Sequence, residues 1–371
     1  MKITLERNHL LKSLGHVHRV VERRNTYPIL ANVLINASEN GIDLRATDLD
    51  IEVSENLQAM VEKQGSTTVP AHTLYEIVRK LSDGAEIKLE VNDNKMSITS
   101  SRSRFSLACL DPNGFPDLKS DDFSHSFNIP AKELALLIER TQFAISNEET
   151  RYYLNGIYMH TLNDDGVEIL RTVATDGHRM ARAQTKAPSG SAGMKGIIIP
   201  RKTVGEVQKL LEGQEDDIRV ELSETKIRFS IGSVVLLSKL IEGTFPDYDR
   251  VTPKDNDKKM VVNRAHFALA IDRVSTIASD RGGKAVKLNI GENLLELSVT
   301  NPDHGVASEE IGVEFNEESF EIGFNASYLL DIVRQIRSEN AIFMFNSSGS
   351  PTLIHEIDND AELYVLMPMR V

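Results

Sequence analysis

The chain has 371 residues, of which 40% are hydrophobic, and a formal net charge of −13 at pH 7. This length and composition can bury ordinary globular cores, and no apolar run approaches the roughly 18 residues that a membrane-spanning helix requires. We therefore exclude a membrane protein. We expect a cytoplasmic location because the sequence enters a strand-like run at once, without a signal-peptide pattern.

Apolar residues recur three or four positions apart in six stretches, which predicts six helices. In chain order these are residues 6–24, 72–81, 131–144, 200–212, 264–281 and 327–338. Runs that alternate apolar and polar residues lie between them, for example residues 41–46 and 293–299, and predict strands. Single short helices among such strands favour an α+β fold in which antiparallel sheets have one face covered by helices.

The same landmarks recur along the chain. Val69-Pro70-Ala71 and Phe115-Pro116-Asp117 return as Ile199-Pro200-Arg201 and Phe245-Pro246-Asp247, and Phe324-Asn325-Ala326 repeats the first of them again. A period of about 125 residues is the size of a domain rather than of a solenoid repeat. We expect three copies of one domain, each made of two helix-plus-strands halves, at residues 1–125, 126–253 and 254–371. Three unrelated domains would leave the shared order unexplained.

Charge is unevenly distributed between the expected helices and the rest of the chain. The helices carry a small positive excess, whereas the remaining chain is strongly acidic. A surface lined by the helices would be weakly basic, too weak to hold DNA by counterion release alone. Domains joined head to tail can close into a ring, which retains DNA by topology, with helices inside and sheets outside. The alternative is that Lys and Arg simply suit helices and are solvated.

Motifs for catalysis are absent from the sequence. It contains no CxxC, HExxH, Walker or GxGxxG pattern, so we expect no metal and no cofactor. The only cysteine, Cys109, excludes an internal disulfide, and its strand-like surroundings favour a packed core thiol over a nucleophile. An enzyme using Asp176 and His178 as an acid–base pair would need a third group and a pocket that the sequence does not offer. A scaffold or regulator that does not bind DNA remains a further alternative.

Ordered motifs along the whole chain carry a resemblance to a known family. They are Pro28-Ile29-Leu30, Ser103-Arg104-Phe105-Ser106-Leu107, Arg151-Tyr152-Tyr153-Leu154-Asn155-Gly156, Thr172-Val173-Ala174-Thr175-Asp176-Gly177-His178-Arg179, Phe245-Pro246-Asp247-Tyr248 and Gly323-Phe324-Asn325-Ala326-Ser327-Tyr328. In these motifs the chain resembles the bacterial DNA polymerase III β sliding clamp family. The resemblance implies a non-catalytic processivity factor: a head-to-tail homodimeric ring around duplex DNA that tethers the replicative polymerase, meets a clamp loader and recruits other proteins with clamp-binding motifs.

The resemblance also implies a groove between the second and third domains that binds short linear peptides. The matching positions are Leu154, Thr175, Gly177, His178, Arg179, Met180, Pro246, Arg250, Val251, Asn325, Tyr328, Val365, Leu366, Met367, Pro368, Met369, Arg370 and Val371. Met180, Val251, Leu366, Met367 and Met369 would supply an adaptable apolar surface, and His178, Arg179 and Arg370 could bond peptide carbonyls. Gly283 stands where well-known members have Phe, which predicts a more open rim. From spacing alone, residues 175–179 could be only a turn, and Met367 and Met369 could face a core.

Two further surfaces follow from the resemblance. Six residues are expected to touch the DNA backbone without distinguishing bases: Arg24, Arg79, Tyr152, Tyr153, Arg201 and Lys202. Glu148 replaces a neutral amide of a well-known member and is expected to weaken that contact. The dimer interface is expected at the edge strand 103–110, with Phe105 and Leu107, and at the helix bearing Ile277.

Overall fold

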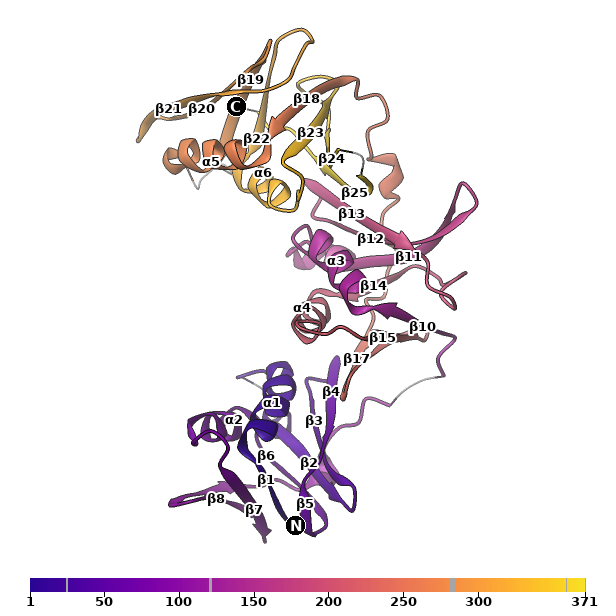
Figure 1. The fold of residues 1–371 in the computed structure, drawn as a ribbon, viewed down its shortest axis with the longest axis vertical. Coiled ribbons are helices and arrows are strands. Elements are labelled where there is room, and N and C mark those ends of the chain that lie inside the picture. Colours follow the sequence, from indigo (N-terminus) through magenta and orange to yellow (C-terminus); the bar gives the residue numbers. More distant parts are fainter. Residues whose placement is uncertain (25, 120–121, 280–283, 358, 371) are drawn as a thin grey trace. The chain divides into compact units, whose positions relative to one another are not determined.

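The computed structural model describes residues 1–24, 26–119, 122–279, 284–357 and 359–370 (Figure 1). The chain divides into two compact units. The first comprises Met1–Ala135, Pro188–Ser191 and Lys202–Leu240, and the second comprises Leu136–Ala187, Ala192–Arg201 and Ile241–Val371. Each unit contains an eight-stranded sheet and a smaller sheet, and every strand pair within them is antiparallel.

The first unit has sheets of eight and five strands. The larger sheet runs in the order β10 (His125–Pro130), β15 (Asp217–Leu222), β16 (Lys226–Ile231), β17 (Val234–Lys239), β4 (Ile51–Leu57), β3 (Gly41–Thr47), β2 (Asn32–Ser38) and β6 (Gly65–Pro70). The smaller sheet runs in the order β5 (Met60–Lys63), β1 (Lys2–Glu6), β7 (Glu86–Asn92), β8 (Lys95–Ser100) and β9 (Ser103–Ala108). Among the described residues, strand β9 therefore has a strand partner on one side only.

The second unit repeats this plan with sheets of eight and four strands. The larger sheet runs in the order β14 (Ile197–Pro200), β11 (Gly156–Asp164), β12 (Val167–Thr175), β13 (Arg179–Lys186), β25 (Asn359–Leu366), β24 (Thr352–Glu356), β23 (Asn340–Phe345) and β18 (Lys258–Asn263). The smaller sheet runs in the order β21 (Gly305–Gly312), β20 (Leu294–Asn301), β19 (Ala285–Gly291) and β22 (Phe320–Asn325). Strand β21 is the exposed edge of this sheet.

Helices cover one face of the sheets. In the first unit α1 (Arg7–Val17) packs on β3 and β4, and α2 (Ala71–Lys80) packs on β2 and β6. In the second unit α5 (Arg264–Val274) packs on β20 and β21, and α6 (Ala326–Val333) packs on β22 and β25. The remaining α-helices of the described residues are α3 (Ala131–Gln142) and α4 (Arg201–Leu210). The expected α+β fold, with helices layered on antiparallel sheets, is confirmed (Figure 1).

The helices begin within one residue of their expected starts, and all but α2, which has the expected length, are shorter. The expected helix at residues 6–24 ends as an α-helix at Val17, and a 3-10 turn, His18–Val20, follows it. That tighter turn lets Val20 and Val21 enter the core, where they are 0% and 3% exposed. The last residues of the expected helix 264–281 lie outside the described residues. None of the helices in the described ranges has the length and apolarity to cross a lipid bilayer.

Each eight-stranded sheet is joined at its centre by strands that are far apart in sequence. In the first unit β4 pairs with β17, with buried Val53 opposite buried Leu236. In the second unit β13 pairs with β25, with buried Ala181 opposite buried Tyr364. The two sheets therefore correspond strand for strand. Cys109 is buried, as expected for a core thiol. The proposed boundaries at residues 125 and 253 remain a prediction.

Candidate functional site

The turn between β12 and β13 is fixed by its own side chains. Thr175 Oγ1 donates to the carbonyl oxygen of Arg179 at 2.7 Å, and Asp176 Oδ1 accepts from the backbone N–H groups of His178 (2.9 Å) and Arg179 (3.0 Å). Gly177 has φ +87°, and a Cβ there would lie 2.5 Å from Arg151 Nη1. Glycine therefore allows both the left-handed turn and the passage of Arg151 across it.

A cavity of about 300 Å³ lies beside this turn, entirely within the second unit. It is lined by Arg151, Tyr153, Leu154, Thr175, Gly177, His178, Arg179, Met180, Pro246, Asp247, Tyr248, Val251, Val365 and Met367. Leu154, Met180, Tyr248 and Val365 belong to one buried apolar cluster, whereas Val251 and Met367 are 54% and 43% exposed. The cavity thus has a fixed apolar floor and a more accessible apolar rim, a surface suited to large apolar side chains.

Two arginines support the cavity wall. Arg151 donates to both carboxylate oxygens of Glu148 (2.7 and 2.6 Å) and to the carbonyl oxygen of Asp176 (3.1 Å). The hydrogen bond from Arg151 lowers the pKa of the Glu148 carboxyl. Arg179 donates to Asp176, to Asp331 (2.7 Å) and to the Phe143 carbonyl oxygen (2.7 Å), and its guanidinium lies 4.3 Å from the Tyr328 ring centre. The Arg179 side chain is therefore fixed by hydrogen bonds and a ring contact within the second unit.

Three polar side chains, those of Tyr248, His160 and Arg171, meet beside the floor of the cavity. The Tyr248 hydroxyl lies 2.9 Å from His160 Nε2 and accepts from Arg171 Nη1 at 3.1 Å. Burial lowers the pKa of His160 and raises that of Tyr248, so both are favoured in their neutral forms. Tyr158 stacks on Phe245 with ring centres 4.8 Å apart. These contacts hold Tyr248 and Phe245, two members of the buried apolar cluster, in place.

The carboxyl-terminal tail closes one side of the cavity. Met367 N–H donates to the His178 carbonyl oxygen and Met369 N–H to that of Gly323, each at 2.9 Å. Leu366 is 0% exposed and is absent from the cavity lining, so the expectation that its side chain offers apolar surface to a peptide is wrong. Leu366 is the last residue of β25, a strand that lies between β13 and β24, and its side chain packs in the core.

The structure brings ten of the expected groove residues together in the lining: Leu154, Thr175, Gly177, His178, Arg179, Met180, Pro246, Val251, Val365 and Met367. Outside it lie Arg250, which pairs with Asp247 at 2.9 Å, and Asn325, whose side chain caps α6. Tyr328 lies behind the wall, with its ring centre 6.2 Å from that of His178. Pro368, Met369 and Arg370 lie further along the tail, and Gly283 and Val371 lie outside the described residues.

Sequence reasoning missed four lining residues. Arg151, Asp247 and Tyr248 were not assigned to the groove, and Tyr153 was expected to touch DNA instead. Their positions in the sequence could have identified them, because they lie next to expected groove residues. Arg151 and Tyr153 precede Leu154 in one motif, and Asp247 and Tyr248 follow Pro246 in another. Tyr153 packs half-buried against the apolar cluster, whereas Tyr152 is 54% exposed.

The expected DNA-contacting residues differ in their availability. Arg24 and Arg79 of the first unit are exposed, and Arg79 also pairs with Glu76 at 2.7 Å. Lys202 donates to the Val20 carbonyl oxygen (3.1 Å), to Asp48 (2.6 Å) and to Glu22. Burial opposes its charge, but the hydrogen bonds to Asp48 and Glu22 outweigh burial and raise the pKa of Lys202. Its charge is therefore largely balanced within the chain.

Arg201 is also engaged by its own unit. Its guanidinium donates to the carbonyl oxygens of Ile145 (2.5 Å) and Ser146 (3.2 Å) and to the Asn147 side chain. These contacts attach the start of α4 to the segment that follows α3. Arg201 and Lys202 are thus both hydrogen-bonded within the chain, unlike exposed Arg24, and the sequence alone did not reveal this difference.

The expected dimer residues lie beside exposed sheet edges. Phe105 on β9 is 40% exposed, and Leu107 is half-buried. Ile277 lies in the 3-10 turn that follows α5, which packs on the edge strand β21. Strand β21 carries Val306, which is 71% exposed, and exposed Glu310. Exposed Arg102 and Arg104 precede Phe105 at the start of β9, so the two edges differ in charge.

Comparison with known proteins identifies the family. Family models of the DNA polymerase III beta subunit match its N-terminal domain at residues 1–119, its central domain at 128–247 and its C-terminal domain at 249–370. The beta sliding clamp of Caulobacter vibrioides (strain NA1000 / CB15N) is 48% identical over 373 residues, with 100% of both chains covered.

Solved structures agree over the full length. The sliding clamp of Bartonella birtlesii bound to griselimycin is 55% identical with a TM-score of 0.98, and that of C. crescentus with PEG bound to a putative beta-motif tethering region is 48% identical with a TM-score of 0.96. Each comparison covers 100% of both chains. The chain therefore belongs to the DNA polymerase III beta subunit family, the bacterial beta sliding clamps.

Proposed function

We infer that this protein is a DNA sliding clamp, a non-catalytic processivity factor that encircles duplex DNA and tethers the replicative polymerase in the bacterial cytoplasm. The observation that carries this function is the full-length match to the beta subunit family in all three of its domains. A clamp needs no reacting group, since it acts by remaining on DNA while its partners work. Its three domains are proposed at residues 1–125, 126–253 and 254–371.

The ring is proposed to be a head-to-tail homodimer. Among the edge strands of the described residues are two of different sequence and high exposure, β9 in the first unit and β21 in the second. Unlike edges pair heterologously, and two such contacts close a ring. Exposed Arg104 on β9 and exposed Glu310 on β21 provide opposite charges for that pairing. The interface is proposed to bury Phe105 and Leu107, with Ile277 on the opposite partner.

DNA contact is proposed to be weak and independent of sequence. Arg24, Arg79 and Tyr152 are exposed, and with Tyr153, Arg201 and Lys202 they form the proposed contact set. The internal ion pairs of Lys202 and the bond of Arg151 to Glu148 reduce the positive charge available to phosphates. Weak contacts suit a ring, because topology retains the DNA while the protein slides.

The cavity of the second unit is proposed to bind short apolar peptide segments of the polymerase, the clamp loader and other clamp-binding proteins. Its apolar floor and rim support this proposal, as does the griselimycin bound to the B. birtlesii clamp. His178 is exposed at the rim and can bond a peptide carbonyl. Griselimycin is proposed to occupy the same cavity here, with Met367 as a movable wall.

Retention on DNA tests the proposed function. The protein is loaded by a bacterial clamp loader on a nicked circular plasmid and separated from free protein by gel filtration. We expect it to stay on the circle and to be lost when one restriction cut makes the DNA linear. A protein that binds both forms equally, or neither after loading, is not a sliding clamp. Solution mass by light scattering provides the second measurement, with a dimer expected.

A further inference from the structure

The first unit contains a structural counterpart of the peptide cavity. The turn between β3 and β4 repeats the turn between β12 and β13 bond for bond: Thr47 Oγ1 donates to the Ile51 carbonyl oxygen (2.8 Å), and Asp48 Oδ1 accepts from the N–H groups of Asp50 (2.9 Å) and Ile51 (2.8 Å). Leu49 has φ +81°, close to the +87° of Gly177. The same backbone therefore frames both places.

The strand after each turn meets an equivalent partner. Lys239 N–H donates to the Asp50 carbonyl oxygen at 2.9 Å, just as Met367 N–H donates to that of His178. In register, Glu52 lies opposite Leu237 as Met180 lies opposite Val365. Here too a cavity is present, of about 200 Å³, lined by Arg45, Glu52, Ser54, Asp117, Leu118, Arg228, Val235 and Leu237.

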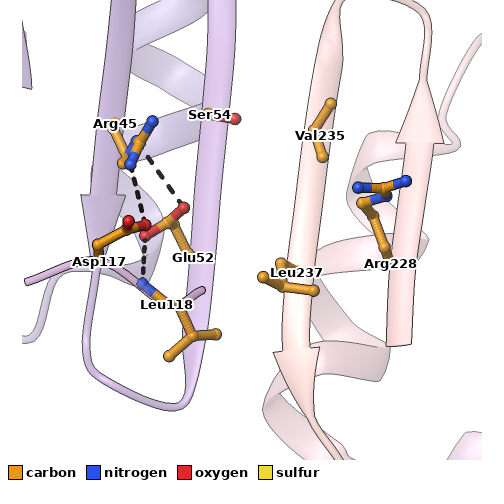
Figure 2. Close-up of a pocket in the computed structure, with 8 residues that line it drawn as sticks. All are labelled: Arg45, Glu52, Ser54, Asp117, Leu118, Arg228, Val235 and Leu237. Atoms are coloured by element: carbon orange, nitrogen blue, oxygen red, sulfur yellow. Dashed lines mark hydrogen bonds and ion pairs between the residues drawn. The ribbon is translucent and has the colours of Figure 1, made fainter. Parts of the chain in front are cut away.

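The floors of the two cavities differ in chemistry. Strand register matches Arg45 with Val173, Glu52 with Met180 and Arg228 with Leu353. Three charged side chains thus stand where the second unit has three apolar ones. Figure 2 shows Arg45, Glu52, Asp117 and the backbone of Leu118 joined in one cluster, with Val235, Leu237 and Arg228 on neighbouring strands.

Two of the three floor charges, Arg45 and Glu52, are only loosely paired. Arg45 Nη1 lies 3.3 Å from Asp117 Oδ1, and Arg45 Nε lies 3.8 Å from Glu52 Oε1. The Glu52 carboxylate accepts from the Leu118 N–H at 3.2 Å and is 8% exposed. Burial raises the pKa of Glu52, so removing more water would disfavour its charge further. Arg228 is held by Glu221 at 2.6 Å and by the Phe123 ring.

We propose that Arg45, Glu52 and Arg228 restrict apolar peptide binding to one of two equivalent grooves in each chain. An apolar side chain entering the first-unit cavity would strip water from these charges without offering hydrogen bonds, and their loose mutual contacts would not compensate for that loss. At the three equivalent positions the second unit has Met180, which lines its cavity, and Val173 and Leu353, which pack in or against the apolar cluster beneath it, so no charge is desolvated at these positions. This inference rests on the proposed peptide function of the second cavity.

The first experiment measures how many griselimycin molecules bind per chain by isothermal titration calorimetry. We expect one per chain. Met180→Glu, which transfers the Glu52 charge to the second cavity, should weaken binding by roughly 100-fold or more, whereas the neutral Met180→Gln should weaken it by about 10-fold at most. Equal losses in both variants would show that charge is not the determinant and would overturn the proposal.

The second experiment converts the first cavity in the Met180→Glu background. Adding Arg45→Val, Glu52→Met and Arg228→Leu should restore binding, with one site per chain. Lys95→Leu, which removes an exposed charge from β8 of the same unit outside the cavity lining, is the matched control and should restore nothing. A converted protein that is folded by circular dichroism and binds no griselimycin up to its solubility limit overturns the proposal.

Two outcomes separate this proposal from the function on which it rests. No binding by the parent protein would contradict the peptide function of the second cavity. Binding of two molecules per parent chain would leave that function standing and contradict the restriction. If the converted protein does not fold, Arg45→Met with Glu52→Met replaces it, because that pair removes both partners of the Arg45–Glu52 contact and leaves Arg228 bonded to Glu221. Measurable griselimycin binding in the Met180→Glu background is then expected, and no binding up to the solubility limit overturns the proposal.

Discussion

Strands β25 and β9 show two uses of the same element. Strand β25 lies between β13 and β24, and Tyr364, Val365 and Leu366 at its end are buried. Within the described part of the chain, strand β9 pairs only with β8, and its residues are largely exposed. A strand with partners on both sides contributes mainly to stability, whereas an edge strand offers unpaired backbone groups to another chain. Position in the sheet, more than sequence pattern, decides between folding and recognition.

The largest expected effect comes from truncating the buried strand. Leu366→Ala removes a side chain that is 0% exposed and should lower the free energy of unfolding by about 3 kcal/mol, within the usual range for such cavities. Phe105→Ala on β9 is the matched control and should cost about 1 kcal/mol or less under conditions where the protein is monomeric. Urea unfolding followed by circular dichroism measures both. Equal losses would break the distinction between the two strands.

The edge strand should matter for assembly instead. Phe105→Asp places a charge at the centre of the proposed interface and should weaken dimerisation by about 3 kcal/mol, which corresponds to more than 100-fold in Kd. Analytical ultracentrifugation at micromolar concentration should show folded monomers. A dimer as tight as the parent would remove β9 from the interface.

Truncation after Leu366 separates the buried strand from its exposed continuation. It deletes Met367 from the cavity wall but retains β25, so griselimycin affinity should fall by about 2 kcal/mol or more. Stability should change by about 1 kcal/mol, because water can replace the two lost tail hydrogen bonds at an exposed site. Calorimetry and thermal unfolding test the two statements separately. Unfolding of the truncated chain would place the tail in the core, and parental affinity would place the binding site elsewhere.

The smallest effect is expected at the proposed DNA surface. Arg24 is exposed there, whereas Lys202 forms ion pairs within the chain. Arg24→Ala should reduce the slope of log K against log salt by about 0.9, the value for one phosphate contact, equally for all DNA sequences. Lys202→Ala should change that slope less, because Glu22 and Asp48 already balance its charge. Fluorescence anisotropy at several salt concentrations measures both. A sequence-dependent loss, or a larger change for Lys202, would contradict this ranking.

The repeat and the helical stripes predicted much of the fold. Leu10, Leu14 and Val17 lie on the buried face of α1, and Leu329, Ile332 and Val333 on that of α6. The central pairings of β4 with β17 and of β13 with β25 were not predicted, because register between strands so far apart depends on the assembled core. Helix ends were also missed, since packing of Val20 and Val21 decides where α1 stops.

The candidate site was predicted in position but less well in detail. The motif around Thr175 placed the turn and its neighbours in the cavity wall. The burial of Leu366 was not visible, because both of its faces are covered by distant segments. Likewise, Arg179 is engaged by Asp331 and Lys202 by Glu22, partners more than a hundred residues away. These side-chain contacts depend on the tertiary structure, which no local sequence pattern contains.

The pairing of β4 with β17 also bears on how the chain would survive a cut. The connection between β9 and β10 joins the part of the chain that ends with β9 to the part that begins with β10. The pairing of β4 with β17, with buried Val53 opposite buried Leu236, holds the same two parts together without a covalent bond. Protease nicking in that connection should therefore leave two fragments that migrate together under native conditions and separate only in denaturant. The same joint makes this connection a natural place to divide the protein into two polypeptides that reassemble by strand complementation.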